Sequence, residues 1–179
     1  MIVWITGISG AGKTTIGKEL CKQWRLKGNK VVLLDGDELR HLFKQDKNIQ
    51  DYSIPSRRKS AERTVMLCEW LDSQDIDVIC SSIAMFSDLR KENRHRFKNY
   101  FEIHLDVTLE TVKRRDPKGL YRKYEIGEMR NIVGIDLPFE DEKTQDITID
   151  NNSDTNNITG IAKDLLSLIQ ENKCRTYEN

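Results

Sequence analysis

The sequence predicts an α/β domain of three layers, in which helices cover both faces of a parallel five-stranded sheet. Short runs rich in β-branched residues alternate with amphipathic segments, which is typical of parallel sheets with helical connections. The runs are almost continuously apolar, as expected of strands that are buried on both faces. The expected strands cover residues 2–6, 30–34, 77–81, 100–105 and 146–149. The expected helices cover residues 12–27, 37–43, 57–73, 88–99, 109–114 and 157–172.

The length of 179 residues suits one domain with its own core, which we expect over residues 1–172, followed by a polar tail at 173–179. Hydrophobic residues make up 37%, and 29 basic side chains balance 29 acidic ones, which argues against a protein that coats nucleic acid or a membrane surface. No apolar run approaches the roughly 20 residues that a membrane span needs. Four scattered cysteines without a metal-ligand spacing indicate reduced thiols and a cytoplasmic protein.

The segment after the first strand matches the phosphate-binding pattern G-x-x-x-x-G-K-[ST] at every fixed position. It consists of Gly7, Ile8, Ser9, Gly10, Ala11, Gly12, Lys13 and Thr14, with Thr15 next to it. Its glycines let the backbone turn several N–H groups toward one anion, and the start of the following helix adds positive partial charge. Lys13 is expected to reach the β- and γ-phosphates of ATP, and the Thr14 hydroxyl to bind Mg²⁺. The pattern therefore predicts a P-loop domain of the nucleoside triphosphate hydrolase type.

Two acids and an arginine, Asp35, Asp37 and Arg40, follow the second expected strand. Ligands of open α/β sheets bind beyond the carboxyl ends of the strands, so these side chains should lie near the P-loop. Either acid could accept a proton from an attacking hydroxyl or support Mg²⁺, and Arg40 could clamp an anionic acceptor. The alternative is that Asp37 only caps the next helix.

Residues 116–145 carry many charges, three glycines and two prolines, with little periodicity. A segment of this length inside a compact domain is usually a functional lid or a binding loop. We therefore expect a lid over about residues 115–138.

Two other classes of protein also carry a P-loop. A regulatory GTPase would need a guanine-reading N-K-x-D after a strand, which the sequence lacks. A regulatory module that binds nucleotides without catalysis would have no need of the acidic pair Asp35 and Asp37 beside Lys13. These residues favour an enzyme over both classes.

Three motifs together resemble those of adenylylsulfate kinases: G-I-S-G-A-G-K-T at 7–14, L-D-G-D-x-x-R-H at 34–41 and R-D-P-K-G-L-Y-R-K at 115–123. The resemblance continues through residues 134–136 and 138–140, and so spans almost the whole chain. It implies a kinase that uses ATP and Mg²⁺ to phosphorylate the 3′-hydroxyl of a small nucleotide, adenosine 5′-phosphosulfate.

The resemblance also implies roles for individual residues. Asp37 would assist the acceptor hydroxyl, while Asp35 and Thr14 would support the metal. From the lid, Arg115 and Lys118 would act on the ATP phosphates, where cations stabilise the charge that develops on the transferred group. A homodimer is compatible with the resemblance, although the sequence identifies no interface. The expected catalytic residues are Lys13, Asp35 and Asp37.

The acceptor side departs from the family. Tyr52 and Ser60 stand where family members carry phenylalanine and asparagine, and Ile132 replaces a lid phenylalanine. The family's Ile-Ser-Pro-Tyr-Arg reads Ile-Ala-Met-Phe-Ser from Ile83. In adenylylsulfate kinases the two phenylalanines sandwich the acceptor's adenine; Tyr52 can still stack, whereas Ile132 offers no π-face. The expected acceptor-binding residues are Asp37, Arg40, Tyr52, Arg57, Ser60, Ile83, Lys123 and Ile132.

These departures suggest that the phosphoryl-transfer groups are retained for a different acceptor. One branch of the family acts on cytidine 5′-diphosphoramidate, an intermediate in the phosphoramidate decoration of bacterial capsules. A smaller pyrimidine and an uncharged amidate suit the changed acceptor side. The sequence favours this compound modestly, and adenylylsulfate stays the alternative because an aliphatic side chain can also pack against a base.

Overall fold

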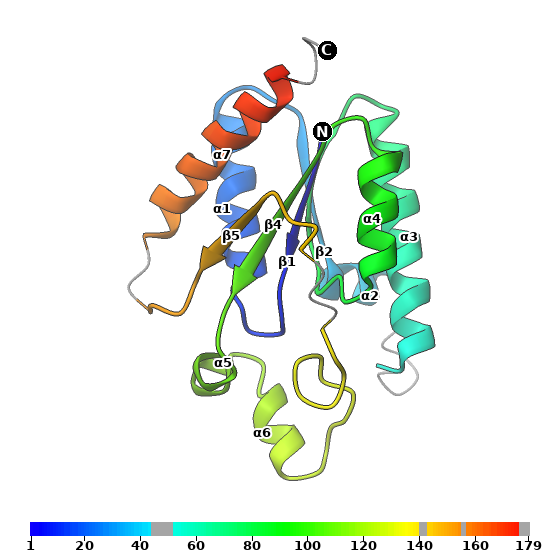
Figure 1. The fold of residues 1–179 in the computed structure, drawn as a ribbon, viewed down its shortest axis with the longest axis vertical. Helices are drawn as coiled ribbons and strands as arrows, with labels where there is room; N and C mark the ends of the chain where they lie inside the picture. The colour runs from blue at the N-terminus through cyan, green and yellow to red at the C-terminus, as the bar shows by residue number, and fades with distance from the viewer. Residues whose placement is uncertain (44–51, 140–142, 155–156, 176–179) are drawn as a thin grey trace.

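The computed structural model describes residues 1–43, 52–139, 143–154 and 157–175. Its centre is a sheet of five strands, all parallel, in the order β2-β3-β1-β4-β5 (Figure 1). The predicted parallel five-stranded sheet is therefore confirmed. The strands are β1 (Ile2–Thr6), β2 (Val31–Asp35), β3 (Asp77–Ser81), β4 (Tyr100–Asp106) and β5 (Ile147–Asp150).

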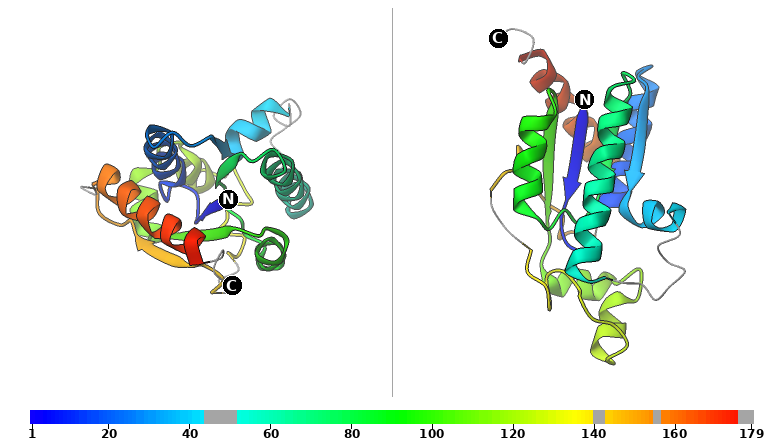
Figure 2. Two further views of the ribbon diagram at one scale, coloured as in Figure 1. Left: turned by 90° about the horizontal axis from the view of Figure 1, so that it is seen from above. Right: turned by 90° about the vertical axis from the view of Figure 1, so that its right-hand side faces the viewer.

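Long helices cover both faces of the sheet, which gives the predicted three layers (Figure 2). On one face α1 (Lys13–Leu26) packs against α7 (Ile158–Arg175) over a large apolar core. On the other face α3 (Ile54–Asp72) and α4 (Ser87–Arg96) cover a second core. The hydrophobic effect holds the layers together, since the central strand β1 is fully buried along its length.

Three short helices lie at the carboxyl ends of the strands (Figure 1). α2 (Gly36–Leu42) follows β2 directly, and α5 (Leu109–Arg115) follows β4. α6 (Leu120–Glu125) lies within the predicted lid. No helix is predicted there from the sequence, and this prediction is wrong. The carboxylate of Asp116 accepts hydrogen bonds from the backbone N–H groups of Tyr121 and Arg122, at 3.2 and 3.0 Å, and so stabilises the first turn of α6.

The predicted helix ends differ from the observed ones for local reasons. α3 begins three residues early because the Ser53 hydroxyl accepts from the Ser56 N–H at 3.4 Å and Pro55 suits a first turn. α4 ends three residues early, at Arg96, where Phe97 turns into extended backbone and packs into the core. α7 continues to Arg175, three residues into the expected tail; residues 176–179 lie outside the described residues.

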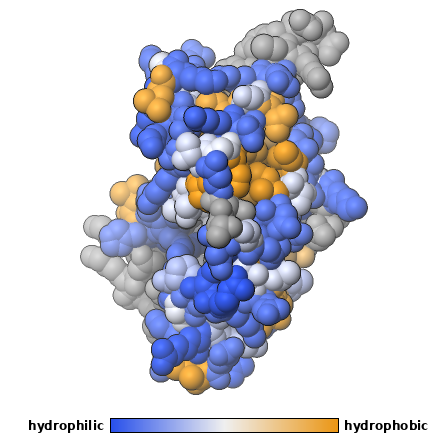
Figure 3. All heavy atoms as spheres, turned by 90° about the vertical axis from the view of Figure 1, so that its left-hand side faces the viewer, coloured by the Kyte–Doolittle hydropathy of each residue, from blue (hydrophilic) through white to orange (hydrophobic). Residues whose placement is uncertain are grey.

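The surface beside α7 is mostly hydrophilic, with an apolar area near its centre (Figure 3). Within the described ranges, none of the helices combines the length and the apolar character needed to cross a bilayer. The homodimer stays a prediction.

Candidate active site

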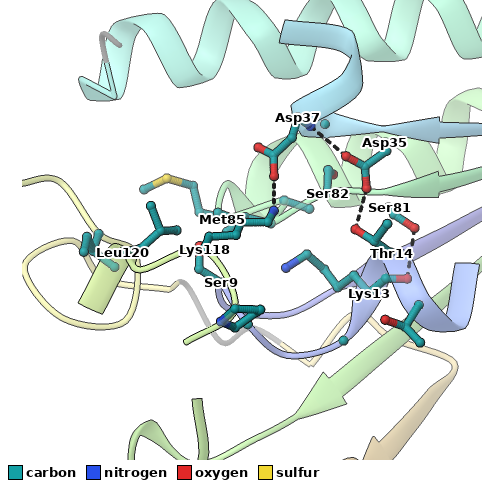
Figure 4. Close-up of a pocket in the computed structure, with 18 of the residues that line it drawn as sticks. Ser9, Lys13, Thr14, Asp35, Asp37, Ser81, Ser82, Met85, Lys118 and Leu120 are labelled. Atoms are coloured by element: carbon teal, nitrogen blue, oxygen red, sulfur yellow. Dashed lines mark hydrogen bonds and ion pairs between the residues drawn. The ribbon is translucent and has the colours of Figure 1, made fainter. Parts of the chain in front are cut away.

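A cavity of about 990 Å³ opens at the carboxyl ends of the strands, between the P-loop, α2, α3 and the lid (Figure 4). This is the place where ligands of open α/β sheets bind. Gly7, Ile8 and Ala11 belong to the P-loop but do not line the cavity. The cavity is lined by these residues of the predicted sites: Ser9, Gly10, Gly12, Lys13, Thr14, Thr15, Asp35, Asp37, Arg40, Tyr52, Arg57, Ser60, Ile83, Arg115, Lys118, Lys123 and Ile132.

The P-loop is held in shape by side chains that bind its carbonyl groups. The Lys13 ammonium donates to the Gly7 and Ile8 carbonyls, both at 2.8 Å. The Tyr121 hydroxyl donates to the Ser9 carbonyl at 2.7 Å. The Asn151 amide donates to the Ala11 carbonyl at 2.8 Å, and it lies so close that a Cβ at Gly12 would approach its nitrogen to 2.6 Å. Gly12 has φ 95°, so both its conformation and its surroundings require glycine.

Lys13 is partly exposed as a residue, but protein surrounds its ammonium group. Burial of the charge, followed by the positive charge of Lys118, lowers the pKa of Lys13 to about 7, against the opposing effect of Asp35. Arg40 lowers the pKa of Lys13 further. Three cations therefore converge on one cavity, as expected for a site that binds a polyanion.

Asp35 joins the end of β2 to the P-loop. Its Oδ2 accepts a hydrogen bond from the Thr14 hydroxyl at 2.6 Å, and its Oδ1 accepts from the N–H groups of Asp37 and Glu38 at 2.9 and 3.3 Å. Asp35 is thus the cap of α2, and the alternative that Asp37 only caps this helix is wrong. The cap is Asp35 and not Asp37 because β2 ends one residue later than predicted, at Asp35.

The Thr14 hydroxyl and the Asp35 carboxylate fit a magnesium site. They are adjacent oxygen ligands, and Mg²⁺ in kinases typically takes one or two protein oxygens and completes its shell with phosphates and water. Within the part of the chain that the structure describes, no group of three or more His, Cys, Asp or Glu could hold a metal. The phosphates of a nucleotide would therefore have to supply further ligands.

The side chain of Asp37 points toward Lys118 of the lid (Figure 4). Its carboxylate forms ion pairs with Arg40, one turn further along α2, and with Lys118 of the lid. These pairs place a half-exposed acid beside the loop that would bind phosphates. The role of Asp37 as a proton acceptor for an incoming hydroxyl stays a prediction.

Arg115 binds a neighbouring loop. Its guanidinium donates to Asp154 Oδ1 at 2.8 Å and to the carbonyl groups of Asn151, Asn152 and Ser153 at 2.8, 3.1 and 2.9 Å. The base of the lid is thereby fixed to residues 151–154. Action of Arg115 on the ATP phosphates stays a prediction.

The acceptor-side residues gather around Arg57. Its guanidinium donates to the Tyr52 carbonyl at 3.0 Å and to the Asn131 carbonyl at 2.8 Å, and lies 5.1 Å from the centre of the Tyr52 ring. Burial, followed by the charge of Arg40, lowers the pKa of Arg57. Arg57 therefore connects the start of α3 to the lid next to Ile132, which is 3% exposed and lines the cavity.

Asn151, Met85 and Phe86 line the cavity but are not among the predicted site residues. Asn151 belongs to a polar loop with no recognisable pattern, and its contact with the P-loop depends on the tertiary fold. Met85 and Phe86 line the cavity and pack with Val133 of the lid in a small apolar cluster. The signal was their place directly after β3, because residues that follow a parallel strand commonly face the ligand.

Comparison with known proteins agrees with this geometry. Residues 1–150 match the family described as adenylylsulphate kinase. The chain belongs to the adenylylsulphate kinase family. A cytidine diphosphoramidate kinase of Campylobacter jejuni is 38% identical over 157 residues, which cover 88% of this chain and 89% of that protein. A probable adenylyl-sulfate kinase of Pseudomonas aeruginosa is 35% identical over 154 residues, which cover 86% of this chain and 71% of that protein.

A solved structure of this family has the same fold. The Mycobacterium tuberculosis APS kinase CysC, in complex with AMPPNP and APS, matches with a TM-score of 0.83 and 29% identity, over 94% of this chain and 96% of that one. The predicted fold, family and reaction class are confirmed: the chain is an ATP-using nucleotide kinase of the adenylylsulphate kinase type with a hydroxyl acceptor. The idea of a regulatory module without catalysis thereby loses its support.

Proposed function

We propose that this adenylylsulphate kinase family member transfers the γ-phosphoryl group of MgATP to the 3′-hydroxyl of cytidine 5′-diphosphoramidate, in phosphoramidate modification of a capsule. The observation that carries the proposal is the acceptor end of the cavity. Tyr52 can stack on a base there, but Ile132 contributes an aliphatic surface where a second aromatic ring is expected. One stacking face suits a small pyrimidine better than a purine, which gains more from two. The Campylobacter jejuni relative, 38% identical, carries the same activity in its name.

Adenylylsulfate is the second candidate acceptor. Arg40 and Arg57 lie on the acceptor side, and their guanidinium groups suit a charged 5′ substituent such as a phosphosulfate. The Pseudomonas aeruginosa relative is named as a probable adenylyl-sulfate kinase. Both candidates use the same donor and the same attacking hydroxyl, so they differ only in what the acceptor side accommodates.

In the proposed reaction the 3′-oxygen of the acceptor forms a bond to the γ-phosphorus while the bond from that phosphorus to ADP breaks. The Asp37 carboxylate takes the proton of the 3′-hydroxyl. Lys13 stabilises the negative charge on the phosphoryl oxygens, and Lys118 exchanges its partner Asp37 for the phosphates, which leaves Asp37 for the acceptor. When bound at Thr14 and Asp35, Mg²⁺ would neutralise charge on the β- and γ-phosphates.

The lid is proposed to close over both substrates. An open site would allow water to compete with the acceptor for the phosphoryl group, so closure favours transfer over hydrolysis. Lys118, Lys123 and Ile132 of the lid all line the cavity, in agreement with this role.

A coupled assay of ADP release with MgATP tests the acceptor, with cytidine 5′-diphosphoramidate and adenosine 5′-phosphosulfate compared side by side and the products identified by mass. We expect strong turnover with the cytidine compound and a kcat/KM at least about tenfold lower with adenylylsulfate, because the wrong base loses stacking and pocket contacts. Turnover with adenylylsulfate alone would assign the enzyme to sulfate activation. Turnover with neither would refute both acceptors.

The affinity for ATP is expected to fall as the pH rises above about 7. In the free protein the pKa of Lys13 is lowered to about 7, whereas phosphate oxygens bound beside it raise that pKa again. Binding above this pH therefore takes up a proton, and the apparent dissociation constant should rise by up to about tenfold per pH unit. Titration calorimetry with a non-hydrolysable ATP analogue, in buffers of different ionisation enthalpy, measures the proton uptake. A dissociation constant that does not change between about pH 7 and 9 would contradict the role of Lys13.

A further inference from the structure

A buried ion pair lies behind the acceptor side of the cavity, outside the site itself. Arg90 of α4 approaches Glu102 of β4 with Nε and Oε1 3.3 Å apart, and their side chains are only 3% and 2% exposed. A buried ion pair is weak evidence for stability, since apolar residues of similar volume often serve a core as well. The other contacts of Arg90 therefore indicate what the pair is for.

One contact of Arg90 holds the loop after β3. Its Nη1 donates to the Ala84 carbonyl at 2.5 Å. Ala84 has φ 51°, a left-handed conformation that a residue other than glycine keeps only where its surroundings impose it. Ile83 and Met85, on either side of Ala84, line the cavity. The direction of these two side chains therefore depends on the conformation that Arg90 holds.

Two other contacts of Arg90 hold the segment after the lid. Its Nε donates to the Thr144 hydroxyl at 3.1 Å, and that hydroxyl donates to Glu102 Oε1 at 2.8 Å. Its guanidinium carbon lies 5.3 Å from the centre of the Phe139 ring. Phe139 packs against the apolar cluster that contains Met85, Phe86 and Val133. Arg90 thus connects the loop after β3 to the segment that leads out of the lid.

We propose that Arg90 is a positioning residue for the acceptor. Through the Ala84 carbonyl it fixes the loop at residues 83–86. Through the Phe139 ring it holds the residue that follows the lid and packs against the cluster of Met85, Phe86 and Val133. Its contacts described above are with Glu102, Thr144, Ala84 and Phe139 and not with the P-loop. Arg90 is therefore expected to act on the acceptor and to leave ATP binding unchanged. This inference rests on the proposed function, which puts the acceptor beside Tyr52 and Ile132, in the cavity that Ile83 and Met85 also line.

The test uses the double variant Arg90→Met with Glu102→Gln, which removes both buried charges and leaves neither unpaired. A single Arg90→Met would isolate the Glu102 carboxylate and endanger folding. Arg96→Met is the matched control: Arg96 lies on the same helix, and its ion pairs are with Glu69 at 2.8 Å and Glu92 at 3.8 Å. Should the double variant not fold, Arg90→Lys keeps a cation beside Glu102 but lacks the fork that reaches Ala84 and Thr144 together.

The double variant is expected to raise the KM for the acceptor by about tenfold or more, because displacement of a pocket wall by about 1 Å has effects of this size or larger. The KM for ATP should stay within about twofold. Amide hydrogen exchange at residues 82–86 should quicken by at least about tenfold, while β1 and β3 keep their protection. Arg96→Met should change neither the acceptor KM nor this exchange.

An unchanged acceptor KM in a folded double variant would overturn the proposal, and so would equal effects in Arg96→Met. If the wild-type protein phosphorylates neither acceptor, the proposed function fails, and the exchange measurement still decides the role of Arg90. Faster exchange at residues 82–86 in the double variant alone then supports the proposal, and unchanged exchange overturns it.

Discussion

Replacement of Lys13 by methionine is expected to lower the turnover number by about a thousandfold. Methionine keeps the length and the apolar stem of the side chain but removes the ammonium that stabilises charge on the transferred phosphoryl group. The site then retains Lys118 and Arg40, which lie nearer to Asp37 in the free protein. Steady-state measurement of ADP release, at saturating MgATP and acceptor, gives the effect on kcat.

The stability of the same variant should stay close to that of the wild type, because it loses the cost of a buried cation together with two hydrogen bonds, from Lys13 to the Gly7 and Ile8 carbonyls. The lowered pKa of Lys13, about 7, lies below that of a lysine in the unfolded chain, so the unfolded state binds more protons between these values. The cost of the buried cation is therefore largest at low pH and is lost as the pH rises through this window. Removal of the cation removes this cost and offsets the lost hydrogen bonds, so the melting temperature of Lys13→Met should stay within a few degrees of the wild-type value at about pH 7.

Lys18→Met is the matched control for this variant. Lys18 lies on the same helix and pairs with Glu38 at 3.5 Å, with its side chain 61% exposed. Its replacement should leave turnover within about twofold, as is usual for an exposed ion pair. A Lys13→Met enzyme with more than about a tenth of the wild-type kcat would contradict the assigned role.

Asp37→Asn is expected to lower kcat by about a hundredfold or more and to leave ATP affinity nearly unchanged. The amide has the size of the carboxylate and can still accept hydrogen bonds from Arg40 and Lys118, but it cannot take the proton of the acceptor hydroxyl. The dissociation constant of a non-hydrolysable ATP analogue and the kcat of phosphoryl transfer separate binding from chemistry.

The neighbouring acid provides the control for Asp37→Asn. The side chain of Glu38 is 62% exposed and pairs with Lys18, so Glu38→Gln should change kcat by less than about threefold. Equal losses in the two variants would point to the net charge of α2 instead of proton transfer. A kcat of wild-type size in Asp37→Asn would remove this residue from the mechanism.

The sheet and the P-loop could be predicted from the sequence because both leave a local signal. β1 and β3 have the predicted bounds, since continuous apolar runs mark strands buried on both faces. α6 could not be predicted in this way. Half of its six residues are charged, and the residues that pack against the core, Leu120, Tyr121 and Tyr124, span too short a helix for an apolar period to develop.

The supporting contacts of the site are tertiary and leave little trace in the sequence. From the sequence, Arg115 is predicted to be a cation of the lid that acts on the phosphates. In the structure its guanidinium donates hydrogen bonds to the loop at residues 151–154, about 40 positions further along the chain. Asn151 belongs to a loop without a recognisable sequence pattern, but its amide donates a hydrogen bond to the Ala11 carbonyl of the P-loop. The identity of the residue that caps α2 depended on where β2 ends. β2 extends to Asp35, one residue further than predicted, so Asp35 and not Asp37 is the cap. Assignment of the cap to Asp35 needed only the rule that a capping side chain accepts from the N–H groups two and three residues ahead.

The hydrogen bond from the Tyr121 hydroxyl to the Ser9 carbonyl joins α6 of the predicted lid directly to the P-loop. Burial, followed by the negative charge of Asp116, raises the pKa of Tyr121 to about 12, so the phenol stays a donor across the physiological range. Movement of the lid away from the P-loop would therefore require that this hydrogen bond breaks or that the loop around Ser9 moves together with the lid. If residues 115–138 act as a lid, this bond couples its opening to movement of the P-loop, and we expect nucleotide release and lid opening to be linked.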